Sequence, residues 1–98
     1  MSSAKIYLNM AALLQRKERV VQAEVDGELV LLSPKGMAYY GAVGTGDSIW
    51  ELIDGTRSTD DIVEQMESQY DAEFGVIREQ VTEFIEGLIV AGLLEETS

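Results

Sequence analysis

Residues 19–33 read RVVQAEVDGELVLLS, two apolar runs rich in valine and leucine that are joined by Asp26-Gly27. Asp-Gly between two such runs is a strong hairpin signal, because both central residues of a type I′ turn need a positive φ angle. We therefore expect residues 19–25 and 28–33 to pair as antiparallel strands.

A turn and a third strand are predicted directly after this hairpin. Ser33-Pro34-Lys35-Gly36 places serine, proline and glycine at the first, second and fourth positions, which is typical of a type I turn. A strand over residues 37–43 should then return along the second strand.

The apolar spacing changes from two to about 3.6 residues after residue 44, which predicts helices. A short helix carries Ile49 and Trp50, with Thr45 or Asp47 as its N-cap, and Asp54-Gly55 should end it. Leu52 and Ile53 complete its apolar set.

Two further helices are predicted. Ser58-Thr59-Asp60-Asp61 resembles a capping box with Asp in the usual Glu position, and it should begin a helix with Ile62, Val63, Met66 and Tyr70 on one face. After a break at residues 71–75, apolar residues from Ile77 to Ile89 recur at helical spacing. Gly92 should end this long helix, and Leu93-Leu94 should fold back onto the core.

The element order predicts an α+β fold, with a three-stranded antiparallel sheet followed by three helices. The helices must cover one sheet face, because so small a sheet is otherwise unstable, and the arrangement resembles a winged helix with its sheet placed first. We assign residues 19–98 to this domain. Residues 1–18 form an N-terminal segment without an assignment, because residues 5–9 favour a strand and residues 10–16 a helical turn.

The composition excludes most kinds of active site. The 98 residues include no cysteine and no histidine, so no thiolate or imidazole can bind a metal or act as a nucleophile or base. Adjacent acids such as Asp60-Asp61 are expected by chance among 18 acidic residues, and we interpret them as solvated. We expect a binding domain that is not an enzyme and that has no catalytic residue, metal or cofactor.

The charge distribution restricts the partners. The net charge is −11, and residues 41–98 carry fourteen acids against Arg57 and Arg78. Such a body repels phosphate backbones and anionic lipids, so nucleic acid and membrane are poor partners and a neutral or basic peptide is a better one. The N-terminal apolar stretch is far below the ~20 residues that span a bilayer, and we expect a cytoplasmic protein.

Two other functions compete with peptide binding. Gly46-Asp47-Ser48-Ile49 looks like the Asp-Ser-Leu site at which acyl or peptidyl carrier proteins receive phosphopantetheine, on Ser48 here. Strand signals precede this site, however, and Asp54-Gly55 ends the next helix early, whereas carrier proteins have long helices on both sides. A structural or oligomerisation module is the second alternative, and a homodimer formed by exchange of strands stays open.

A set of short motifs resembles a known family. These motifs are LLSPKGMAYY at residues 31–40, Gly46, IWELIDG at residues 49–55 and Gly92-Leu93-Leu94. Their order is similar to that of the pyrroloquinoline quinone biosynthesis protein D (PqqD) family, whose fold is also called the precursor-peptide recognition element. The resemblance covers roughly residues 19–95. Ala42-Val43 and Gln80 depart from it, since the family usually has Leu-Asn and often Asp at these places.

The resemblance implies a non-catalytic adaptor. Such a domain captures the leader segment of a ribosomally made precursor peptide and presents it to a modifying enzyme, such as a radical SAM enzyme, a cyclase or a leader peptidase. The leader lies as an extra strand against the third strand, in a groove shared with the third helix. The peptide-binding residues implied here are Met37, Ala38, Tyr39, Tyr40, Gly41, Ala42, Val43, Ile77, Arg78, Val81, Phe84, Ile85 and Leu88. The competing expectation is that the N-terminal segment itself covers this strand edge.

Overall fold

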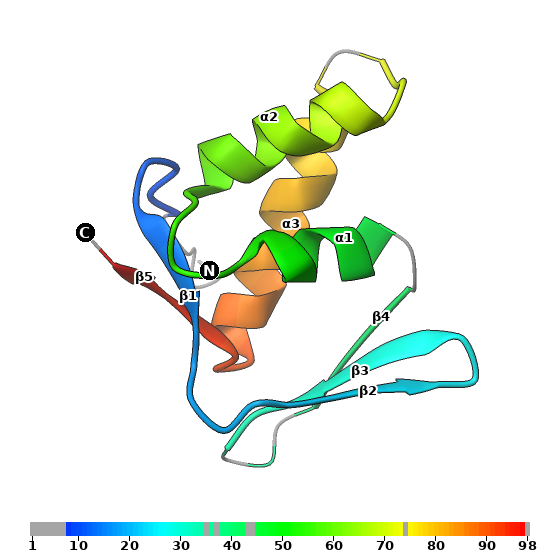
Figure 1. The fold of residues 1–98 in the computed structure, drawn as a ribbon, viewed down its shortest axis with the longest axis vertical. Coiled ribbons are helices and arrows are strands. Elements are labelled where there is room, and N and C mark those ends of the chain that lie inside the picture. The colour runs from blue at the N-terminus through cyan, green and yellow to red at the C-terminus, as the bar shows by residue number, and fades with distance from the viewer. Residues whose placement is uncertain (1–7, 35, 37, 43–44, 74, 98) are drawn as a thin grey trace, which may run out of the picture.

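The computed structural model describes residues 8–34, 36, 38–42, 45–73 and 75–97 (Figure 1). Four strands come first: β1 (Leu13–Arg16), β2 (Val21–Val25), β3 (Glu28–Leu32) and β4 (Ala38–Ala42). The helices α1 (Thr45–Leu52), α2 (Thr59–Gln69) and α3 (Val76–Val90) follow, and β5 (Leu94–Thr97) closes the fold. The predicted α+β fold, a three-stranded antiparallel sheet followed by three helices, is confirmed.

The predicted hairpin is present at the predicted turn. Asp26 and Gly27 have φ angles of 50° and 79°, and Val25 lies opposite Glu28, so the loop is the dipeptide Asp-Gly alone. The next turn is closed by the N–H of Gly36, which donates to the carbonyl of Ser33 at 2.9 Å. Strand β4 then pairs antiparallel with β3, which gives the strand order β2-β3-β4.

Local signals also set the helix ends. The hydroxyl of Ser58 accepts from the N–H of Asp61 at 3.1 Å, and the Asp61 carboxylate accepts from the N–H of Ser58 at 3.0 Å, which confirms the capping box. Helix α1 begins at Thr45, so Asp47 lies inside its first turn. The prediction that Thr45 or Asp47 caps this helix was wrong, because a cap precedes the helical residues and both of these lie within the helix.

The end of α3 returns the chain to the core as predicted. Gly92 has a φ of 76°, and its N–H donates to the carbonyl of Ile89 at 3.0 Å. The N–H of Leu93 donates to the carbonyl of Leu88 at 2.9 Å, which completes a Schellman motif. Leu93 and Leu94 are buried.

A second, two-stranded sheet joins the two ends of the described chain. Strands β1 and β5 pair antiparallel, with Leu13 opposite Thr97, and they lie side by side in Figure 1. On its other side β1 contacts the turn between α1 and α2, because Leu14 donates to Arg57 and accepts from Gly55, each at 2.9 Å. Residues 13–16 thus form a strand, although the sequence pattern of residues 10–16 favours a helical turn.

The core lies between the helices and one face of the β2-β3-β4 sheet. Leu29 and Leu31 of β3 are buried on that face, whereas every residue of β2 is exposed. Trp50 of α1 is the largest fully buried side chain, and burial of each large apolar side chain contributes about 1.5–3 kcal/mol. No helix among the described residues is long and apolar enough to cross a membrane.

Candidate functional site

Strand β4 lies at one edge of its sheet. It pairs with β3 on one side, and no strand of the described chain pairs with it on the other. The described part of the N-terminal segment forms β1, which pairs with β5 instead of β4. Residues 37 and 43 of the predicted site lie outside the described residues. For β4, the pairing register with β3 defines which way the backbone groups point.

The register decides which main-chain groups of β4 point to the open edge. Val25 and Glu28 flank a two-residue loop, and such a pair exchanges both main-chain bonds across its hairpin. Bonding alternates along β3, so Leu29 directs its main-chain groups to β4. Gly41, opposite Leu29, therefore bonds with β3, whereas the N–H of Ala42 points to the open edge. The main chain of Ala38 and Tyr40 points the same way as that of Ala42.

Four predicted residues of α3 belong to the core. Val81, Ile85 and Leu88 are fully buried, and Ile77 is 8% exposed. A surface ligand cannot reach these side chains without a change in the fold, so their contribution in this structure is to position the helix. The exposed part of α3 must supply any direct contact.

Phe84 has a different position. Its side chain is half-buried and packs against the edge of the core, and a Cβ built at Gly46 would lie 3.4 Å from its Cε1 atom. Gly46 follows the end of β4 by four residues. Phe84 thus places an aromatic ring at the junction between β4 and α1.

Arg78 is not brought together with Phe84. Its guanidinium pairs with Asp60 of α2 at 3.2 Å, so it lies on the side of α3 that contacts α2. Six residues separate Arg78 from Phe84, which corresponds to about 120° around a helix axis.

A further set of α3 residues, not predicted from the sequence as part of the site, lies on the exposed side of the helix. These residues follow one another at intervals of four, three, four and three positions, and all of them are exposed or half-exposed. We call Val76, Gln80, Glu83, Gly87 and Val90 the α3 stripe. Val76 and Val90 are 38% and 61% exposed, which is high for valine. The helical spacing that predicts the buried face of α3 also predicts this exposed stripe on another side of the helix. The stripe lies beside Phe84 and away from α2.

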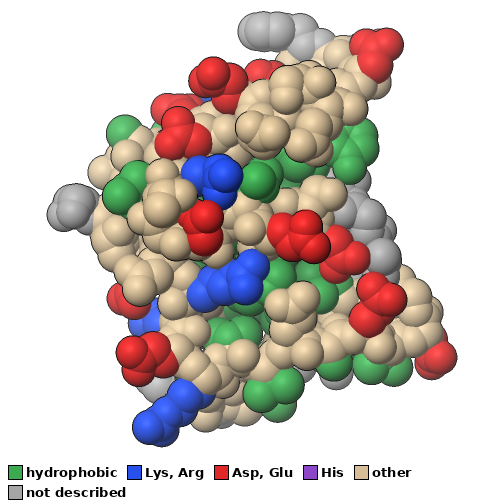
Figure 2. All heavy atoms as spheres, viewed as in Figure 1, with side chains coloured by type: hydrophobic (Ala, Val, Ile, Leu, Met, Phe, Trp, Pro, Cys, Tyr) green, Lys and Arg blue, Asp and Glu red, His purple; other side chains and the backbone are tan. Residues whose placement is uncertain are grey.

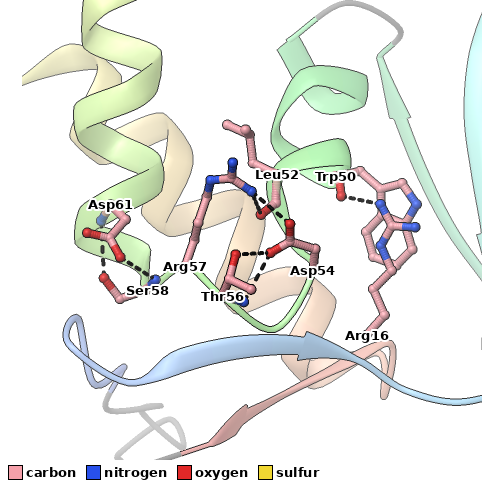
Figure 3. A network of polar contacts seen from close by, with 8 residues as sticks. All are labelled: Arg16, Trp50, Leu52, Asp54, Thr56, Arg57, Ser58 and Asp61. Carbon is pink, nitrogen blue, oxygen red and sulfur yellow. Dashed lines mark hydrogen bonds and ion pairs between the residues drawn. The ribbon is translucent and has the colours of Figure 1, made fainter.

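The polar contacts near α1 stabilise the fold (Figure 3). Asp54 accepts from the hydroxyl and the N–H of Thr56 and pairs with Arg57 at 2.9 Å. The bonds from Thr56, followed by the charge of Arg57, hold the pKa of Asp54 below its ordinary value. All these groups lie within one turn, so the cluster secures the α1–α2 connection.

Arg16 joins β1 to α1. Its guanidinium carbon lies 4.3 Å from the ring centroid of Trp50, and its Nη2 donates to the carbonyl of the same residue (Figure 3). Burial lowers the pKa of Arg16, while Asp54 and Glu51 raise it. Cation–π contact and hydrogen bond together give Arg16 a structural role.

No cluster of three or more potential metal ligands exists among the described residues. Ser48, the carrier-like serine, is half-buried within the eight-residue α1, and its hydroxyl lies 3.4 Å from that of Tyr70. A strand precedes α1. This setting lacks the long flanking helices that the carrier hypothesis requires.

On the face shown in Figure 2, acidic side chains are scattered over the surface and outnumber the basic ones. Hydrophobic side chains gather at the lower rim of this face, where the β2–β3 hairpin lies in Figure 1. Among the described hairpin residues, Val21 and Val25 are 56% and 51% exposed.

Comparisons with known proteins place this geometry in context. The sequence model of the family described as Coenzyme PQQ synthesis protein D (PqqD) matches residues 28–94. A solved structure, TbiB1 in complex with the TbiA(beta) leader peptide, is 26% identical with a TM-score of 0.67, and the match covers 83% of this chain and 94% of that chain. No curated protein matches.

Proposed function

Because this chain belongs to the coenzyme PQQ synthesis protein D family, we propose that it is a non-catalytic adaptor for a ribosomally made precursor peptide. It captures the leader segment as an added strand on the open edge of β4 and presents the peptide to a separate modifying enzyme. The observation that carries this proposal is the structural likeness to TbiB1, a protein solved with a leader peptide bound. The match covers 94% of the TbiB1 chain.

The open edge of β4 supports this mode of binding. An edge strand offers unpaired N–H and C=O groups, and an extended peptide that pairs with them gains main-chain bonds without a particular side-chain sequence. In the register seen here, the leader bonds with the main chain of Ala38, Tyr40 and Ala42. Specificity then comes from the side chains that the peptide meets beside the sheet.

We assign that second role to Phe84 and the α3 stripe. Phe84 lies against Gly46 in the first turn of α1, four residues after β4 ends, and the stripe continues from it along the exposed side of α3. Val76 and Val90 provide apolar contacts at the two ends of the stripe, with Gln80 and Glu83 as hydrogen-bond partners between them. Gly87, which has no side chain, allows a close approach of the peptide backbone.

A chemical-shift titration tests the proposal. The ¹⁵N-labelled domain is titrated with the TbiA(beta) leader peptide and with the leader of any short precursor encoded beside this chain. We expect at least one leader to shift the amides of β4 and of the α3 stripe. Shifts confined to α2, with β4 and α3 undisturbed, would contradict the proposed site.

A further inference from the structure

Strand β2 forms a second open edge of the same sheet. It pairs with β3 on one side, and no described strand lies on the other. Five consecutive pairs leave no bulge in β2, and the strand contains neither proline nor lysine, which commonly protect an edge. By the alternation of the hairpin, the main-chain groups of Gln22 and Glu24 point outward from this edge.

The side chains of β2 divide between two different surfaces. Val21, Ala23 and Val25 lie on the sheet face away from the core, all exposed. Gln22 and Glu24 lie on the face toward α1, where the Trp50 Nε1 donates to the Gln22 Oε1 at 2.7 Å. The side chains of a strand added to β2 would alternate between these two faces. Every second side chain would contact the apolar face, and the others would contact the polar face.

The polar surface is an acidic hollow of about 400 Å³ between β2 and α1. Glu24, Asp47 and Glu51 line it together with Gln22 and Ala23, and the buried Leu29 lies at its base. The two ion pairs among the described side chains, Arg57–Asp54 and Arg78–Asp60, include none of these acids. Arg16 attracts Glu51, which leaves Glu24 and Asp47 as acids that an incoming cation would neutralise.

From this geometry we infer that β2 accepts a strand of a partner protein in which aliphatic residues alternate with lysine or arginine. The aliphatic side chains cover Val21 and Val25, and the cations enter the acidic hollow. This surface is distinct from the β4 edge, so both edges can be occupied together.

Charge makes a second copy of this chain a poor occupant. Pairing of two β2 strands would bring Glu24 of each copy toward the other copy's acids, and each chain carries a net charge of −11. Inward-pointing charge is also how natural edge strands resist self-association. The same acids that oppose a like chain attract a basic one.

The test uses a fluorescently labelled eight-residue peptide of alternating valine and lysine, with alternating valine and glutamate as its control. We expect anisotropy to report binding of the lysine peptide alone, and the Trp50 indole N–H resonance to shift because Gln22 accepts from it. Equal binding of the two peptides would overturn the inference.

Three variants separate main chain, charge and location. Glu24→Pro removes the outward N–H and should abolish binding, whereas Glu24→Gln keeps it and should weaken binding about two- to five-fold. Glu28→Gln removes the same charge from β3 on the other sheet face and should change nothing. Circular dichroism checks that each variant folds. Binding by Glu24→Pro equal to that of the unmodified chain would refute the β2 edge.

Two controls distinguish this inference from the proposed function. Ala42→Pro blocks the β4 edge and should leave the lysine peptide bound to β2. If Ala42→Pro lost binding of the lysine peptide, the peptide would bind at the β4 edge, and the inference would be overturned. Sedimentation of the chain alone should give a monomer, and a dimer that Glu24→Pro dissociates would make a second copy the occupant.

Discussion

Phe84 and Leu88 lie one helical turn apart on α3 and are expected to respond differently to truncation. Leu88→Ala opens a cavity in the core, which should cost ~2–5 kcal/mol of unfolding free energy. Phe84→Ala removes a half-buried ring beside Gly46 of α1, and we expect it to weaken leader binding by ~1–3 kcal/mol. Urea unfolding and peptide titration measure the two effects. If Phe84→Ala bound the leader as tightly as the unmodified chain, the ring would contribute to packing and not to leader binding.

Asp54 should make the stability depend on pH. Its pKa is lowered in the folded chain, so its contribution is complete above the ordinary aspartate pKa of about 4 and is lost as pH falls through the folded value. Asp54→Asn should therefore lose less stability than the unmodified chain when pH is lowered from 5 to 3. Thermal unfolding at several pH values checks this, and parallel curves for the two proteins would be the contrary result.

At the scale of residues, local chemistry was predictable from the sequence. The Asp26-Gly27 turn and the Ser58–Asp61 capping box depend on neighbours within four positions, and both are present as expected. The exposure of Phe84 was not predictable. Its position in the helical period is similar to that of Leu88, and its contact with Gly46 depends on how α1 and α3 pack.

At the scale of elements, two proline substitutions at the end of β4 should have different effects. Ala42→Pro removes an N–H that points to the open edge, so the fold should persist while leader binding is lost. Gly41→Pro removes an N–H that bonds with β3, so it should lower the melting temperature. Circular dichroism and titration separate the two outcomes. Full leader binding by a folded Ala42→Pro variant would rule out strand addition at this edge.

The β2-β3-β4 sheet could be predicted, whereas the β1–β5 sheet could not. Turn residues specify the first, because its strands follow one another along the chain. Strands β1 and β5 have four residues each and lie at opposite ends of the sequence, so no short-range pattern connects them. Tertiary contacts select strand geometry for residues 13–16, including the bonds that Leu14 makes with the α1–α2 turn.

At the scale of the whole molecule, the acidic surface should steer association. A basic leader approaches a chain of net charge −11, and screening shortens the Debye length to ~8 Å at physiological ionic strength. We expect the association rate constant to fall as salt rises, with a smaller change in the dissociation rate constant. Stopped-flow measurements across a salt series check this, and a rate independent of salt would limit the acids to solubility.

The pairing of β1 with β5 brings the first and last strands of the described chain together. Leu13 and Thr97 face each other, so anything joined before β1 or after β5 is tethered at one place on the surface. An enzyme fused to either end would explore nearly the same volume around the domain. Linker length, more than the choice of terminus, would then set the local concentration of a catalytic domain at a captured peptide. A circular permutant that joins these ends and opens the Asp26-Gly27 turn should accordingly keep both sheets.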